Sequence, residues 1–309
     1  MNYRTLTRGP FLTAWAAFLL AQIGSSTGLV ALLWLANQRG GGVGAVGILT
    51  AAATLPAVAS GIYAGMLLDR MPRGLAIALD NLGRGLIYAA VALLAARPAF
   101  PLAAVTALVA LGSALSPLSA AGILSLVPDL LTDGQQLGPA NAAINAVWQI
   151  ATLVGPGLGG ALVARFGAPL PIGLQAVLYL AASALMAGLP PVRGGSAAGS
   201  SPLAGARLLF GTPALHAIAL FTLAYWLLYA PLEVVLPGFV SHDLRLGAVA
   251  YGLLWTMNAI GALVGSVLSG LLPCRASVSG SRRTISAGAS SPSRSHPPEA
   301  FPPRLWRLV

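Results

Sequence analysis

The amino-acid sequence predicts an all-α protein, a polytopic transmembrane helical bundle of about eight spans. Of its 309 residues, 57% are hydrophobic and 8% are charged, and the mean hydropathy is +0.82. About a quarter of the residues of a typical soluble domain are charged. The apolar residues gather into long runs, and roughly 20 such residues suffice for a helix to cross the hydrocarbon core of a bilayer. We therefore expect the lipid bilayer to be the principal partner of this chain.

Gly, Pro and Arg separate the apolar runs and give the approximate ends of each span. The first run, from Phe11 to about Ala36, is longer than the apolar region of a cleavable signal peptide, so we expect it to be retained. We expect the spans at about residues 11–36, 45–68, 75–96, 101–127, 142–165, 169–190, 214–239 and 248–272.

The net charge of +10 comes from Arg alone, because the chain has no Lys. These Arg residues punctuate apolar runs instead of forming a basic patch with interleaved aromatic residues, which argues against nucleic-acid binding. Basic residues in short loops tend to stay in the cytoplasm. With a cytoplasmic N-terminus, seven Arg residues fall inside and four outside, so we expect this orientation in a bacterial plasma (inner) membrane. The inside set is Arg4, Arg8, Arg70, Arg73, Arg193, Arg207 and Arg275, and the outside set is Arg39, Arg97, Arg165 and Arg245.

An internal repeat suggests how the spans are grouped. Residues 46–70 align without gaps on residues 251–275, pairing Gly47 with Gly252 and Gly65 with Gly270. Either Gly- and Leu-rich helices align by chance, or six spans form one unit that starts again at span seven. The second interpretation predicts a six-helix bundle at 1–190, a cytoplasmic linker at 191–213 and the first two helices of an incomplete second bundle at 214–272.

The composition changes abruptly after residue 272. Residues 273–309 are rich in Arg, Ser and Pro and contain no apolar run long enough to span, so we expect a disordered basic tail. Either this is a genuine cytoplasmic tail, or it results from a reading-frame shift that truncates the protein.

A glycine, a carboxylate and two basic residues end the second span. Gly65 permits close helix packing, Asp69 can face a helix N-terminus, and Arg70 and Arg73 can anchor at anionic headgroups. An ordinary basic loop explains the Arg residues but explains a carboxylate at the membrane boundary less well.

This segment resembles the loop between spans two and three of the major facilitator superfamily, Gly-x-x-x-Asp-Arg-x-Gly-Arg-Arg, except that Pro72 replaces a Gly and Gly74 replaces the last basic residue. The segments Val127–Leu131 and Leu137–Ala142, and Asp80-x-x-x-Arg84, are similar to the branch that exports siderophores and macrolides. The resemblance covers roughly residues 10–272. It implies two helical halves that rock about a site near the midplane of the membrane.

The fifth span contains a run of glycines around a proline, Gly155, Pro156, Gly157, Leu158, Gly159 and Gly160. Pro removes a backbone hydrogen bond and Gly thins the helix, so the run is either a hinge or a close packing face. It resembles the span-five element of the facilitator exporters, which implies a hinge.

Charged residues within spans are costly and are therefore functional candidates. Asp80 and Arg84 are one helical turn apart and can neutralise each other, either as a structural pair or as a functional one. Glu233 has no basic residue within two turns of its own helix. It either lies near the outer interface or binds a proton, since a carboxylate in apolar surroundings is easiest to bury when protonated.

Uncharged polar residues within the spans either line a central cavity or form hydrogen bonds between helices. The candidates for substrate contact are Gln22, Asn145, Gln149 and Tyr229.

These observations predict a secondary active transporter of the major facilitator type. We expect a proton-coupled exporter, an antiporter that carries a small amphipathic molecule such as a drug, siderophore or metabolite by alternating access. An inactive truncated transporter is the alternative. A membrane enzyme is less favoured, because His216, His242 and His296 are scattered and no nucleotide-binding or nucleophile motif occurs. A single cysteine, Cys274, offers no multi-cysteine metal site. We expect no cofactor and no metal.

Overall fold

The computed structural model describes residues 9–68, 70–131, 136–190 and 210–271. The chain divides into two compact units, Met1–Gly265 and Ser266–Val309, and the second is described only at residues 266–271. The expected linker is described from residue 210 onward, and the expected tail at 273–309 lies outside the described residues. The fold and the candidate site below belong to the first unit.

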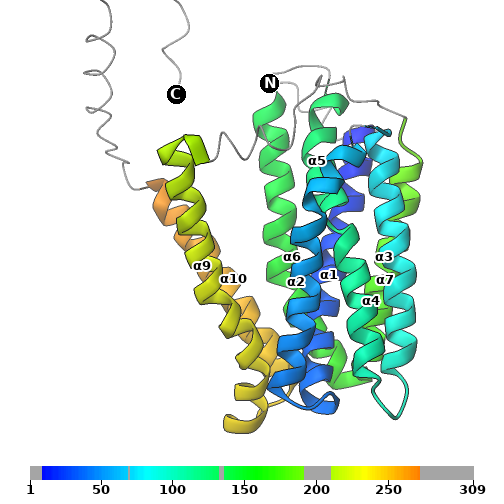
Figure 1. The fold of residues 1–309 in the computed structure, drawn as a ribbon, viewed down its shortest axis with the longest axis vertical. Coiled ribbons are helices and arrows are strands. Elements are labelled where there is room, and N and C mark those ends of the chain that lie inside the picture. Colours follow the sequence, from blue (N-terminus) through cyan, green and yellow to red (C-terminus); the bar gives the residue numbers. More distant parts are fainter. Residues whose placement is uncertain (1–8, 69, 132–135, 191–209, 272–309) are drawn as a thin grey trace, which may run out of the picture. The chain divides into compact units, whose positions relative to one another are not determined.

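The described residues form helices and no strands, as the sequence predicts (Figure 1). In the part of the chain that the structure describes, eight helical stretches are long and apolar enough to cross a membrane, in agreement with the expected number of spans. The helices are α1 (Pro10–Arg39), α2 (Val43–Leu68), α3 (Arg73–Ala95), α4 (Leu102–Leu115), α5 (Pro117–Leu130), α6 (Leu137–Phe166), α7 (Pro169–Ala187), α9 (Pro213–Gly238) and α10 (Ala248–Leu271), with a π-helical turn at Phe239–Asp243.

The fourth span is two helices, not the single helix that its hydropathy suggests. The break lies at Ser116, between the end of α4 and Pro117 at the start of α5. Proline lacks an N–H group and its ring crowds the carbonyl four residues earlier, so the helix cannot continue unchanged through this point. Instead, the Ser113 carbonyl accepts hydrogen bonds from both the backbone N–H and the hydroxyl of Ser116.

Proline and glycine mark the ends of the other helices. Pro10, Pro169 and Pro213 occupy first-turn positions of α1, α7 and α9, where a missing N–H costs nothing. Gly41 and Gly42 have φ values of 110° and 80° in the turn between α1 and α2. That left-handed backbone favours glycine and allows a tight connection between two spans.

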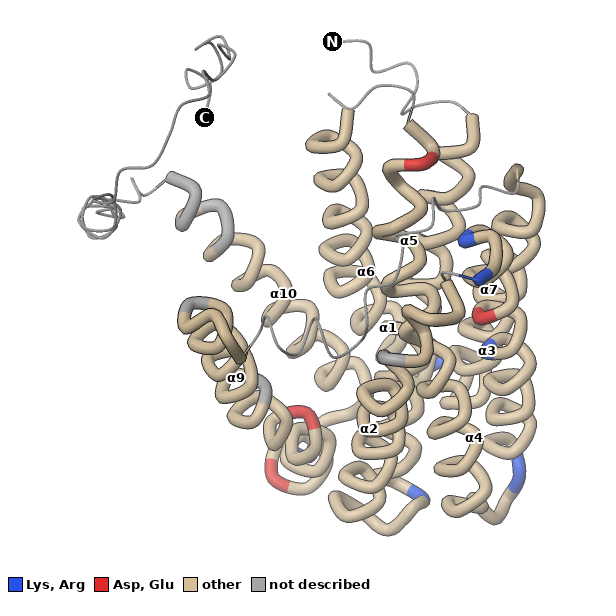
Figure 2. Tube along the Cα trace, turned by 45° about the horizontal axis from the view of Figure 1, so that its top comes forward, with Lys and Arg blue, Asp and Glu red and all other residues tan. Residues whose placement is uncertain are grey.

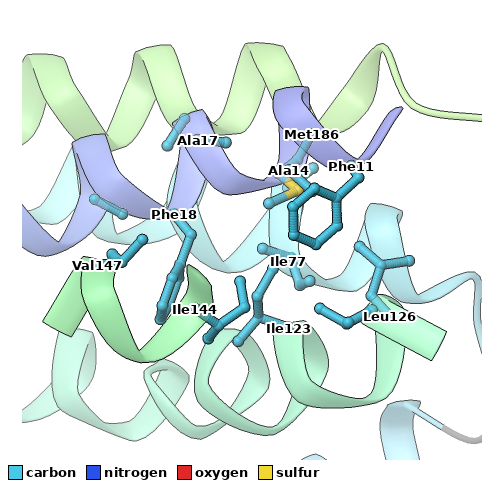
Figure 3. Packing of buried hydrophobic residues seen from close by; sticks show 14 of the residues in the cluster. Phe11, Ala14, Ala17, Phe18, Ile77, Ile123, Leu126, Ile144, Val147 and Met186 are labelled. Carbon is cyan, nitrogen blue, oxygen red and sulfur yellow. The ribbon is translucent and has the colours of Figure 1, made fainter. Parts of the chain in front are cut away.

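The centre of the first unit is a layer of buried apolar side chains. Figure 3 shows Phe11, Ala14, Ala17 and Phe18 of α1 facing side chains of neighbouring helices, namely Ile77, Ile123, Leu126, Ile144, Val147 and Met186. The small side chains Ala14, Ala17 and Ala21 of α1 allow close approach of α6 and α7, which both pack against it. α1 is thus the central helix of this layer.

Two further pairings complete the packing around α1. α3 packs along α7, and α2 packs along α4 (Figure 1). Acidic and basic residues are sparse along all the described helices, as Figure 2 shows. The few charges that do lie within spans are therefore the natural starting point for a functional site.

Candidate functional site

A cavity of about 310 Å³ lies among the helices. Helices α1 to α7 and α9 contribute side chains to its wall. Part of the wall is apolar and includes the Phe18 and Trp148 rings, and part is polar. The polar lining comprises Gln22, Ser25, Thr50, Thr54, Arg84, Tyr88, Ser113, Ser116, Ser119, Gln175 and Glu233. A cavity of this volume and mixed lining suits a small amphipathic ligand.

Arg84 and Asp80 lie in the middle of α3, deep in the packed helices. Asp80 is 1% exposed and Arg84 is 9% exposed. Arg84 Nη1 lies 3.9 Å from Asp80 Oδ2, and Arg84 Nη2 donates a hydrogen bond to the Tyr179 hydroxyl. The Ser119 hydroxyl donates to Asp80 Oδ2. The expected pairing of these two residues is therefore present, although at a distance too long for a hydrogen bond.

Glu233 of α9 is partly buried and lines the same cavity as Arg84 and Gln22. It also lines a second cavity of about 190 Å³ with Tyr229, Trp255 and Asn258. In that second cavity Asn258 Nδ2 donates to the Tyr229 hydroxyl at 3.1 Å. Glu233 is thus the acidic residue that borders both cavities.

Two of the expected substrate contacts lie elsewhere. Asn145 and Gln149 are exposed on α6, and neither lines either of these two cavities. Trp148, between them in sequence, does line the larger one.

Sequence reasoning missed several lining residues, among them Tyr88, Ser119 and Gln175. Gln175 is 2% exposed and is the one amide side chain in the apolar run of α7. An isolated amide in an apolar span is a signal that could have identified it. Tyr88 is one helical turn after Arg84, so it shares that face of α3 and could have been inferred with it.

The glycine run of α6 lies between two other helices. A Cβ atom at Gly159 would lie 2.6 Å from the Thr27 carbonyl oxygen of α1, and one at Gly155 would collide with Ser26. On the other side, a Cβ atom at Gly160 would collide with the Ala248 carbonyl of α10. Pro156 is buried within α6. The run therefore packs closely against α1 and α10, and a hinge role remains a proposal.

The loop after α2 is held by one of its basic residues. Arg73 Nη1 donates to Asp129 Oδ2 of α5 at 2.5 Å and to the Ser125 carbonyl at 2.5 Å. Arg70 is exposed, and Asp69 lies outside the described residues. A Cβ atom at Gly65 would meet nothing within 4 Å. Two segments that the sequence singles out separately, 65–73 and 127–131, are therefore joined by an ion pair.

Within the described residues, no group of three His, Cys, Asp or Glu side chains is placed to hold a metal ion.

Apolar spans, a cavity among the helices and a loop held by the Arg73–Asp129 ion pair are features to compare with those of known membrane proteins. The profile of the Major Facilitator Superfamily matches residues 14–291. The chain belongs to this superfamily. It is an integral membrane protein of a transporter family.

Curated relatives in this superfamily extend the comparison. The chain is 28% identical over 279 residues to a protein of Sinorhizobium fredii named uncharacterized MFS-type transporter y4rN, covering 88% of this chain and 69% of the relative. It is 29% identical over 242 residues to the multidrug efflux pump Tap of Mycolicibacterium fortuitum, covering 74% of this chain and 59% of the pump. It is 29% identical over 290 residues to Tap of Mycobacterium tuberculosis, covering 88% of this chain and 68% of that pump. The chain thus spans roughly three fifths to two thirds of the length of these relatives.

Proposed function

We propose that this facilitator chain functions as a proton-coupled exporter of a small amphipathic molecule. The observation that carries the proposal is the cavity of about 310 Å³, which joins aromatic and aliphatic walls to a small set of polar groups. An amphipathic molecule places its apolar body against such walls and its polar group on the convergent polar side chains. The efflux function in the names of the Tap relatives supports export as the direction.

Glu233 is the group that we propose to carry the proton. It lies between the two cavities, and no basic side chain among the described residues pairs with it. A carboxylate without a counterion in a membrane span is stabilised by taking up a proton. Release of that proton restores the negative charge. Glu233 can therefore be protonated when the cavity opens to one side of the membrane and deprotonated when it opens to the other.

We also propose that the N-terminus is cytoplasmic, in the inner membrane of a bacterium. Arg70 and Arg73 then lie on the cytoplasmic side, in agreement with the tendency of basic loops to remain there.

The test is transport in inside-out membrane vesicles from cells that produce the full chain. Radiolabelled aromatic amphiphiles with acidic, basic and neutral head groups are the probes, and the vesicle interior is acidified by ATP hydrolysis. We expect at least one probe to accumulate only when the interior is acidic, with collapse of the accumulation by an uncoupler. No accumulation above vesicles without the chain would overturn the proposal and favour an inactive transporter.

Glu233→Gln separates coupling from binding in this assay. We expect the variant to lose accumulation driven by acidity but to keep exchange of labelled for unlabelled probe, which needs no net proton movement. Arg97 is an exposed loop residue, so Arg97→Gln is the matched control. We expect it to accumulate and exchange the probe as the natural chain does. Undiminished acid-driven accumulation by Glu233→Gln would exclude Glu233 as the proton carrier.

A further inference from the structure

The buried guanidinium of Arg84 has hydrogen-bonding capacity that its protein neighbours do not use. Nη2 donates to the Tyr179 hydroxyl, but Nη1 is 3.9 Å from Asp80 Oδ2. Nε is buried and has no hydrogen-bond partner among the described residues. Arg carries five N–H donors in a planar fork, and leaving them unmatched away from water is costly. Arg84 also lines the cavity, so its Nη1 group, which makes no hydrogen bond with the described residues, is the donor available to a ligand that accepts hydrogen bonds.

The carboxylate that should neutralise Arg84 is directed elsewhere. Asp80 Oδ2 accepts the hydroxyl of Ser119, which belongs to α5, while Asp80 Oδ1 has no hydrogen-bond partner among the described residues. Asp80 is thus held by the first turn of a different helix, close to Arg84 but out of hydrogen-bonding reach. It lowers the electrostatic cost of burying the guanidinium without occupying the fork.

The cavity side of Arg84 is rich in groups that complement an organic anion. Tyr88, one turn along α3, and Gln175 of α7 line the cavity with it, and both can donate hydrogen bonds. Phe18 and Trp148 form apolar parts of the same wall. Among the described lining residues, Arg84 is the one basic side chain.

We propose that Arg84 is the anion-binding residue of the cavity, and that its ligands are amphipathic carboxylates which compete with Asp80 for the guanidinium. A carboxylate matches the two-pronged geometry of the guanidinium better than a neutral oxygen does. The apolar body of such a ligand then packs against the Phe18 and Trp148 side chains. Glu233 lines the cavity from α9 and repels an anion, but it acts through space, whereas Arg84 acts through direct charge-assisted hydrogen bonds.

This proposal names the substrate class of the cavity and rests on the proposed function for its role in transport. Binding can be measured without transport, so the two can fail separately. Vesicles that accumulate no probe would count against export alone. Vesicles that accumulate probes regardless of head group would count against Arg84 as an anion site.

The direct test uses three probes that share one aromatic body. These are 1-naphthoate, 1-naphthalenemethanol and 1-naphthylmethylamine, titrated by calorimetry into the purified full chain in detergent. We expect naphthoate to bind about tenfold more tightly than the alcohol, as one charge-assisted hydrogen-bonding contact would give. Equal affinity of the three probes, or tightest binding of the amine, would overturn the proposal.

Variants of the charged pair should move anion affinity in opposite directions. Arg84→Gln should remove the preference for naphthoate, and Arg84→Lys should retain part of it, because the charge stays while the planar fork is lost. Asp80→Asn should tighten naphthoate binding several-fold, because it removes the internal competitor, while leaving the alcohol unchanged. If Arg84 and Asp80 only stabilise the fold, every variant should bind all three probes more weakly and by the same factor.

Two further proteins keep the test decisive. Arg84→Gln leaves Asp80 buried without its partner, so the double variant Asp80→Asn with Arg84→Gln removes both charges and leaves no buried charge unpaired. It should bind the alcohol normally and show no preference for naphthoate. Arg97→Gln should bind all three probes as the natural chain does. A preference for naphthoate that survives in the double variant would place the anion site elsewhere.

Discussion

Arg73, at the start of α3, donates a hydrogen bond of 2.5 Å to the carboxylate of Asp129, near the end of α5. The two side chains are 56 positions apart in sequence and are 19% and 24% exposed. Arg73 also donates to the Ser125 carbonyl, one turn before Asp129 in α5. Arg73 is therefore fixed to two successive turns of one helix.

Arg73→Gln should lower the free energy of unfolding by about 1–2 kcal/mol, because a partly buried charged hydrogen bond and a carbonyl contact are both weakened. Asp129→Asn should cost less, since the Ser125 contact remains. A double-variant cycle measured by thermal unfolding in detergent should give a coupling of about 1 kcal/mol. Arg70→Gln, exposed in the same loop, should change little. A coupling of zero would show that the pair contributes nothing in the membrane protein.

Gly159→Ala tests whether the glycine run is a packing face. The new methyl group would lie 2.6 Å from the Thr27 carbonyl oxygen, so α1 and α6 must separate. We expect a loss of about 1–3 kcal/mol in stability. Gly138→Ala, also in α6 but with nothing within 4 Å, is the matched control and should be neutral. Unchanged stability with loss of transport would instead favour a hinge.

Asn37→Ala tests the contact of α1 with the end of α9 and with the π-helical turn that follows it. Asn37 is 5% exposed, and its Nδ2 donates to Ser241 Oγ at 2.8 Å and to the Pro237 carbonyl at 3.3 Å. Removing both bonds should cost about 1–3 kcal/mol. Ser241→Ala should cost less, because the Pro237 carbonyl still accepts from Asn37. An equal or larger loss for Ser241→Ala would show that the hydroxyl has another role.

Cysteine labelling tests the proposed orientation. In a Cys274→Ser background, Arg97→Cys should react with a membrane-impermeant maleimide in intact cells, because its loop is expected outside. Arg70→Cys should react only after the cells are permeabilised. Both positions are exposed, so accessibility within the protein is matched. The opposite pattern would reverse the orientation of every span.

Hydropathy predicts the spans well because a helix in lipid must satisfy all its backbone groups internally, so length and apolarity are sufficient signals. It does not predict the break at Ser116, since α4 and α5 form one continuous apolar run. The π-helical turn at Phe239–Asp243 was likewise not predicted; it follows Pro237, which cannot donate the regular helical hydrogen bond.

The candidate site was predicted in part. Glu233, Arg84 and Gln22 stand out as polar residues in apolar runs, and the structure brings them to one cavity. Asn145 and Gln149 give the same signal, yet they are exposed on α6. A span with apolar residues on all sides does not reveal from sequence which of its faces turns inward. Ser119 was missed because its role depends on Asp80, 39 positions earlier.

The break at Ser116 leaves α5 as a short helix that contacts a charged residue of α3 at each of its ends. Its first turn holds Asp80 through Ser119, and its last turn holds Arg73 through Asp129. These two anchor residues are ten positions apart, about 15 Å along a helix. α5 therefore joins the Arg73–Asp129 ion pair in the loop region to the Asp80–Ser119 hydrogen bond beside Arg84, which lines the cavity.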